Sequence, residues 1–159
     1  QRFDNHWLLA RHRGRGALIS TASDAHACRI ARRLSEAHGH ARLDWVMVLD
    51  PVATDAQACW RTLARWVQSP QLGHPPLALG QQLFSEGLAL ELLADRGQPM
   101  LLRVGAQRWR LFPRPQALWA LQYSATGMHD ASNHRSWLGF QPSPAQRRWL
   151  EKNGVQVGH

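Results

Sequence analysis

The sequence of 159 residues has few of the residues on which several common protein classes depend. Its two cysteines, Cys28 and Cys59, are too few for a disulfide framework or a thiolate-rich zinc site. It has no run of about 18 apolar residues, which excludes a helix that spans a bilayer, and we expect no membrane partner. It does not begin with the basic stretch and apolar core of a secretion signal. Cysteines expected to be free thiols and the missing signal together favour a cytoplasmic location.

Motifs of the common catalytic classes are missing as well. The sequence contains no phosphate-binding loop, no dinucleotide-binding G-x-G-x-x-G and no G-x-S-x-G nucleophile elbow. Asp50 follows a predicted strand, where open α/β sheets hold catalytic groups, but capping chemistry explains it more simply. His129, Asp130 and His134 have ligand types that suit zinc, but an ordinary polar loop also accounts for them. The sequence therefore favours a protein without catalysis, cofactor or metal; a hydrolase-like enzyme using Asp50 and this loop is the second alternative.

Positive charge is what the sequence has in excess. It has 19 Lys+Arg against 11 Asp+Glu, a formal net charge of +8, and Lys152 is the only lysine. Arginine binds phosphate and carboxylate through a planar fork, and an excess of positive charge attracts polyanions such as nucleic acid. A high-GC coding bias in a bacterial genome would give the same composition without any ligand. Composition alone therefore does not distinguish ligand binding from coding bias, and the positions of the arginines in the sequence are needed.

The hydrophobic pattern of the first half predicts two βα units. Strands are predicted over 17–21 and 43–49, and the second is almost continuously apolar, as in a parallel sheet with both faces covered. Each predicted strand is followed by a predicted helix. This order is typical of an α/β fold with right-handed crossovers.

The two helices are marked by capping residues. The first is predicted over 25–38, with Asp24 as its cap. The second is predicted over 55–68, where Thr54 and Gln57 have the spacing of a capping box.

The second half has a different pattern. A loop rich in proline and glycine, 69–80, marks a possible seam between subregions. Three strand patterns separated by turn signals predict an antiparallel meander, over 88–93, 100–104 and 107–112. A helix is predicted over 116–123, and a final helix is predicted to begin at Ser143 as its cap, followed by Pro144, and to end at Gly154. We expect one α/β domain, with an α+β fold as the alternative, and Gln1 in place of methionine suggests a fragment of a longer chain.

The hairpin around Gly105 gives some of the arginines a predicted geometry. A two-residue turn places Arg103 opposite Arg108. Because side chains alternate across a sheet, Arg110 lies on the same face as these two. Like charges opposed on a ribbon are unfavourable unless an anion neutralises them, so this face is a candidate site for a phosphate backbone.

Other charged residues are predicted to lie near this face of the hairpin. Arg96 and Arg114 lie near the ends of the strands and extend the predicted basic surface. The alternative is that carboxylates of the adjoining strand, from Glu86, Glu91 or Asp95, pair with the arginines.

A second basic cluster lies near the start of the chain. Arg11, His12, Arg13 and Arg15 are interleaved with glycines, a pattern that fits along a phosphate backbone or into a groove. The alternative is a solvated lead-in to the first strand.

The eight tryptophans are many for this length. Five fall on predicted core faces: Trp45, Trp60, Trp66, Trp109 and Trp119. Trp137 is the best candidate for an exposed aromatic that stacks on a base or anchors a partner. The final helix presents Arg147, Arg148 and Trp149 together and offers a second docking surface.

These patterns favour a non-catalytic nucleic-acid-binding domain, for DNA or RNA, with an arginine-rich face. The predicted contact residues are Arg103, Arg108, Arg110, Arg96, Arg114, Trp137, Arg13 and Arg15. The alternative is a protein–protein interaction domain or accessory subunit of a larger bacterial assembly, whose arginines meet an acidic partner.

Overall fold

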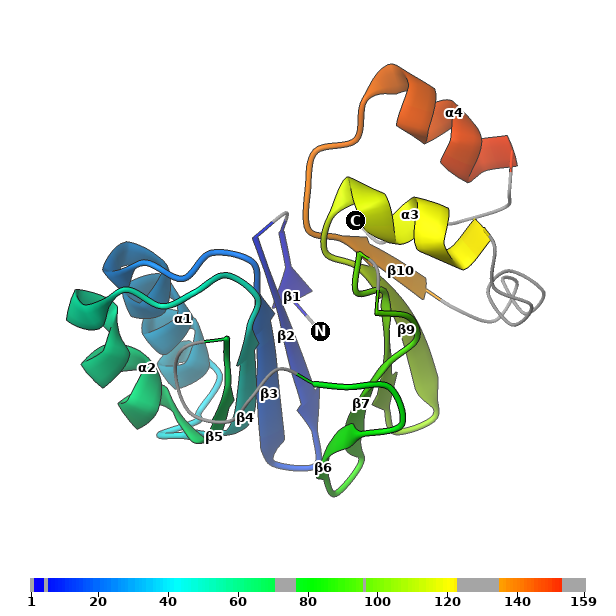
Figure 1. The fold of residues 1–159 in the computed structure, drawn as a ribbon. Helices are drawn as coiled ribbons and strands as arrows, with labels where there is room; N and C mark the ends of the chain where they lie inside the picture. The colour runs from blue at the N-terminus through cyan, green and yellow to red at the C-terminus, as the bar shows by residue number, and fades with distance from the viewer. Residues whose placement is uncertain (1, 5, 71–76, 96, 123–134, 153–159) are drawn as a thin grey trace.

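Two mixed five-stranded sheets pack face to face in the computed structural model, which describes residues 2–4, 6–70, 77–95, 97–122 and 135–152 (Figure 1). Sheet A has the order β1 (Arg2–Phe3), β2 (Trp7–His12), β3 (Arg15–Ser20), β4 (Leu43–Val48) and β5 (Ala64–Gln68). Sheet B has the order β10 (Arg135–Leu138), β9 (Gln107–Phe112), β8 (Met100–Val104), β7 (Leu88–Leu92) and β6 (Gln82–Ser85). The predicted α/β class is confirmed, with the βα units in sheet A and the meander in sheet B.

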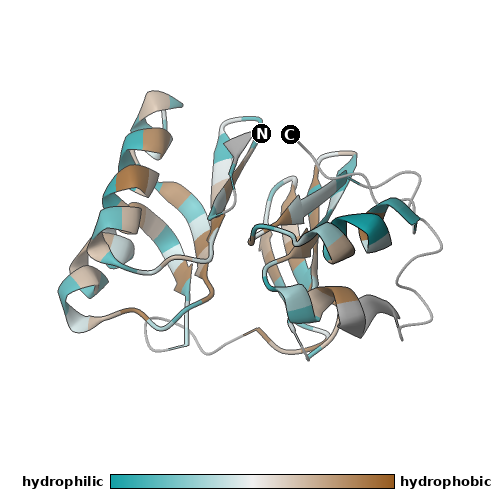
Figure 2. Cartoon of the chain, turned by 90° about the horizontal axis from the view of Figure 1, so that it is seen from above, coloured by the Kyte–Doolittle hydropathy of each residue, from teal (hydrophilic) through white to brown (hydrophobic). Residues whose placement is uncertain are grey.

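Helices lie on the outer side of each sheet, so the layers are helices, sheet A, sheet B and helices (Figure 2). On sheet A these are α1 (Ala25–Ala37) and α2 (Gln57–Leu63), which follows a short 3₁₀ turn, η1 (Thr54–Ala56). On sheet B they are α3 (Pro115–Gln122) and α4 (Pro144–Lys152). None of the described helices is long and apolar enough to cross a membrane.

Capping side chains begin two of these helices as predicted. Asp24 Oδ1 accepts a hydrogen bond from the Ala27 amide at 2.7 Å at the start of α1. At α4 the Ser143 amide donates to Gln146 Oε1 at 2.8 Å, and the Gln146 amide donates to Ser143 Oγ at 3.2 Å. This exchange is a capping box. The predicted end of the helix at Gly154 lies outside the described residues.

The second predicted helix, 55–68, is wrong in its second half. The helix ends at Leu63, and β5 follows at once in parallel register with β4, where Trp45 pairs with Trp66. The expected side-chain cap from Thr54 is also missing in this described segment. Pairing with the buried strand β4 outweighs the helical spacing of the apolar residues. Trp66 consequently lies on an edge strand and is 43% exposed, not in the core.

The two cysteines are joined to each other, so the expectation of free thiols is wrong. Cys28 of α1 and Cys59 of α2 form a disulfide, with their Cα atoms 6.2 Å apart. Both helices pack on the same outer face of sheet A, a proximity that the spacing along the sequence does not reveal. The pair cross-links the helix layer of this sheet.

The inner faces of the two sheets share one core. Every second residue of the long strands points between the sheets, because side chains alternate along a strand. Trp137 of β10 belongs to this core: it is 1% exposed, and its indole N–H donates to the Asp4 carbonyl oxygen at 2.6 Å. The expectation of an exposed, stacking Trp137 is therefore wrong, since its strand pairs in parallel with β9. Trp45, Trp60 and Trp109 are buried as predicted, and the Trp119 side chain lies outside the described part.

Candidate nucleic-acid interface

The predicted register of the arginine hairpin is confirmed. Val104 pairs with Gln107 across a two-residue turn, and Arg103 lies opposite Arg108. Arg103 and Arg108 are exposed on the outer face of sheet B, while the alternate residues of both strands enter the core.

The third arginine of the hairpin is not at the surface. Arg110 is 3% exposed, and its cross-strand neighbours Leu101 and Ser136 are buried as well. The outer face of sheet B is therefore covered from this row onward, toward the side where Phe112 packs against α3 and α4. The expectation that Arg110 binds a ligand at an open surface is therefore wrong. The alternation of side chains along β9 predicts which face Arg110 lies on, but not whether that part of the face is covered.

One of the two exposed arginines has an acidic neighbour. Arg103 Nη2 lies 3.4 Å from Glu91 Oε1, so the alternative of pairing with an adjoining strand holds here. Arg108 has no carboxylate within 4.0 Å among the residues that the structure describes. The ribbon thus carries one paired and one unpaired positive charge at its tip.

The second basic cluster is a hairpin, not a lead-in. Strands β2 and β3 are antiparallel, and Arg13 and Gly14 form the turn between them with φ angles of 49° and 80°. Arg13 is exposed and, within the described part of the chain, has no acidic partner. Arg11 Nη1 lies 2.6 Å from His38 Nδ1, at the end of α1. A polar pocket of about 230 Å³ lies between this hairpin and the end of α1.

The two basic clusters meet at one end of the sandwich. His12 of β2 packs against Gly87 in the β6–β7 turn and against Gly105 in the β8–β9 turn. A Cβ atom added to Gly105 would lie 2.7 Å from His12 Cε1, so the turns approach closely because glycines occupy them. We call this end of the molecule the basic end; the β2–β3 and β6–β7 turns mark it in Figure 1. Its arginines are Arg11, Arg13, Arg15, Arg103 and Arg108.

The other predicted contact residues have different positions. Arg15 belongs to the basic end but lies between Asp44 and Glu86, at 3.6 Å and 3.9 Å. Arg114 follows β9 away from the basic end, and its Nη2 lies 2.6 Å from Asp50 Oδ1. This ion pair also engages the carboxylate considered for catalysis. Arg96 lies outside the described residues.

Two exposed aromatic side chains near the basic end were not predicted as ligand contacts. Phe84 of β6 is 73% exposed, and Trp66 is the half-exposed residue of β5. Both line a groove of about 320 Å³ between the open edges of the two sheets, together with Arg65 and Ser85. The strand β6 falls just after the predicted loop and was missed; the alternation of Leu83 inward and Phe84 outward is the signal that could have found it.

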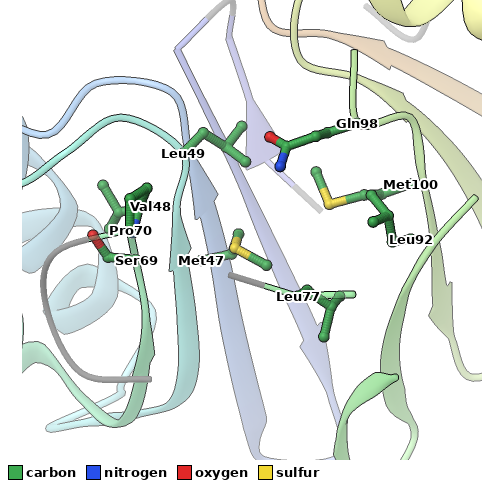
Figure 3. A pocket seen from close by; sticks show the side chains of 9 residues that line it. All are labelled: Met47, Val48, Leu49, Ser69, Pro70, Leu77, Leu92, Gln98 and Met100. Atoms are coloured by element: carbon green, nitrogen blue, oxygen red, sulfur yellow. The ribbon is translucent and has the colours of Figure 1, made fainter. Parts of the chain in front are cut away.

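The opposite end of the sheets has a small apolar cavity. It has a volume of about 50 Å³ and lies at the carboxyl ends of β4 and β5, with Met47, Leu49 and Met100 in its wall (Figure 3). Gln98 extends its amide toward the space between the sheets and has a φ angle of 53°. Carboxyl ends of parallel strands often hold ligands, but none of the described lining residues is charged.

Metal ligands do not gather in the part of the chain that the structure describes. Within it, no three His, Cys, Asp or Glu side chains are placed to hold one ion. His129, Asp130 and His134, which the sequence offered as a possible zinc site, lie outside those residues. Comparison of the chain with protein-family models, curated proteins and solved structures gives no match.

Proposed function

We propose that this chain is a non-catalytic nucleic-acid-binding domain that holds phosphates at its basic end. The observation that carries the proposal is the convergence of arginines from two hairpins far apart in the sequence. Two of them, Arg13 and Arg108, have no acidic partner among the described residues.

The electrostatics of this end favour a polyanion. Arg103 and Arg108 are directly opposed across the ribbon, which is unfavourable for like charges, and the carboxylate of Glu91 lies beside Arg103 only. Each guanidinium can bind a phosphate through two parallel hydrogen bonds. The formal net charge of +8 adds a long-range field that attracts nucleic acid.

The sequence also favoured a cytoplasmic location, and this stays a prediction. The Cys28–Cys59 disulfide counts against it, because reducing systems keep most cytosolic thiols unpaired.

A salt titration of nucleic-acid binding tests the proposal. We expect the binding constant for mixed-sequence single-stranded and double-stranded DNA or RNA to fall steeply with salt. In the double variant Arg13→Ala, Arg108→Ala the slope of log K against log salt should become shallower by about 1.4–1.8, because each lost phosphate contact removes about 0.7–0.9.

The matched control removes the same charge from the other end of the molecule. Arg147 and Arg148 are exposed on α4, which Figure 1 places away from the β2–β3 and β6–β7 turns. The variant Arg147→Ala, Arg148→Ala should keep the slope of the unaltered protein. Equal effects of the two double variants, or binding to an acidic protein but to no nucleic acid, contradict the proposal.

A further inference from the structure

An aromatic residue and the arginines of the ribbon share one row across sheet B. Phe84 pairs with Ala89, Ala89 with Arg103, and Arg103 with Arg108, so all four side chains lie on the outer face. Neighbouring strands lie about 4.8 Å apart, which places Phe84 about 10 Å from Arg103 along this row. The exposed ring and the exposed guanidinium groups therefore belong to one continuous surface.

A second ring lies across the groove from the first. Trp66 is paired in register with the buried Trp45 and points to the same face of sheet A, but its edge strand leaves the ring half-exposed. The Trp66 indole N–H donates to Gln68 Oε1 at 2.9 Å, which orients the ring. Arg65, the preceding residue, is exposed and lines the same groove.

Flat rings beside exposed guanidinium groups match the chemistry of an unpaired nucleic-acid strand. Bases of a single strand expose their faces for stacking on aromatic side chains, while its phosphates bind basic groups. In a duplex the base faces are already stacked and cannot reach Phe84 or Trp66. Large exposed aromatic residues that gather in one groove also indicate a binding surface rather than ordinary exposure.

We infer that the ligand of this surface is single-stranded nucleic acid, whose bases stack on Phe84 and Trp66 while its phosphates bind Arg103 and Arg108. The inference rests on the proposed function and adds the class of nucleic acid to it. Strands β5 and β6 are also open sheet edges, which can pair with an extended peptide. The groove holds one residue of each charge, Arg65 and Asp44, and the Asp44 carboxylate lies 3.6 Å from Arg15. The positive charge of the adjoining basic end favours the polyanion, and the peptide is an outcome of the test.

The test compares three labelled probes by fluorescence anisotropy. The probes are a single strand of about 12 nucleotides, an abasic strand of the same length and the corresponding duplex. The unaltered protein should bind the normal single strand at least about fivefold more tightly than either of the others, which is the lower end of the effect of stacking one base.

Substitutions at the exposed ring locate the stacking. Phe84→Ala should weaken binding of the normal strand at least about fivefold, and Phe84→Tyr should restore it, with little change for the abasic strand. Trp66→Leu should act in the same direction, and Trp66→Phe should retain binding. Ile30→Ala, which removes an exposed apolar side chain from α1, is the control and should change nothing.

The outcomes separate this inference from the proposed function. If the aromatic variants bind the single strand as the unaltered protein does, or if the abasic strand or the duplex binds equally well, the inference is overturned. The proposed function survives those outcomes provided that the Arg13 and Arg108 substitutions still lower the salt dependence. If an extended peptide binds in the groove and no probe binds, both proposals are wrong.

Discussion

The outer faces of the two sheets differ in how completely they are covered. On sheet A, outward residues such as Leu18 and Val46 pack with the two disulfide-linked helices in one buried cluster. On sheet B, the cover extends over Phe112 and stops before Phe84 and Arg108. The helix layer therefore covers the outer face of sheet A, whereas part of the outer face of sheet B is exposed to solvent.

The strand β9 shows this difference within a few residues. Its outward side chains are Arg108, Arg110 and Phe112, and they change from exposed to buried along the strand. A basic and aromatic surface on the uncovered half does not contribute to the core. The surface that we propose as the ligand site therefore lies where the helix layer of sheet B ends, beside the basic end.

Two phenylalanines lie on the outer face of sheet B, one in its covered part and one in its exposed part. Phe112→Ala should lower the free energy of unfolding by about 3–5 kcal/mol, because it removes a fully buried ring from the cluster under α3 and α4. Phe84→Ala should change it by no more than about 0.5 kcal/mol, because the ring is mostly in water. Urea denaturation of both variants measures the two values. A large loss at Phe84 would show that its half of the face is structural.

The next largest effect concerns the helix layer of sheet A. Reduction of the Cys28–Cys59 disulfide should lower the free energy of unfolding by about 2–4 kcal/mol, because the bond closes a loop between residues separated by 31 positions. Denaturation with and without reductant measures the loss, and the variant Cys28→Ala, Cys59→Ala should no longer respond to reductant. The layer of α3 and α4 has no such bond, since both cysteines of the chain lie in α1 and α2. Equal stability of the reduced and oxidised protein would contradict this prediction.

Local periodicity was enough to predict much of this fold. The apolar run of β4 and the register of the Arg103–Arg108 ribbon follow from the two-residue repeat of a strand, and both are confirmed. The cap of α1 at Asp24 follows from local chemistry in the same way.

Features that depend on distant partners could not be predicted in this way. Helical spacing continued through Trp66, and only pairing with β4 turns that segment into a strand. The two basic clusters were found separately, but their meeting depends on His12 packing against Gly87 and Gly105, more than 70 residues away in sequence. Burial of Arg110 and Trp137 likewise depends on what covers each row of sheet B.

The smallest expected effect concerns the ion pair between Arg103 and Glu91 on the uncovered face of sheet B. Glu91→Gln removes the carboxylate that lies 3.4 Å from Arg103 and, among the residues that the structure describes, leaves both ribbon arginines without an acidic neighbour. The free energy of unfolding should change by less than about 1 kcal/mol, since both side chains are partly in water. Affinity for the single strand at low salt should rise by up to about fivefold, the equivalent of one exposed ion pair. Glu151→Gln on α4 removes the same charge from the helix layer and should leave affinity unchanged; equal gains from both variants would mean that net charge, and not the uncovered face, sets binding.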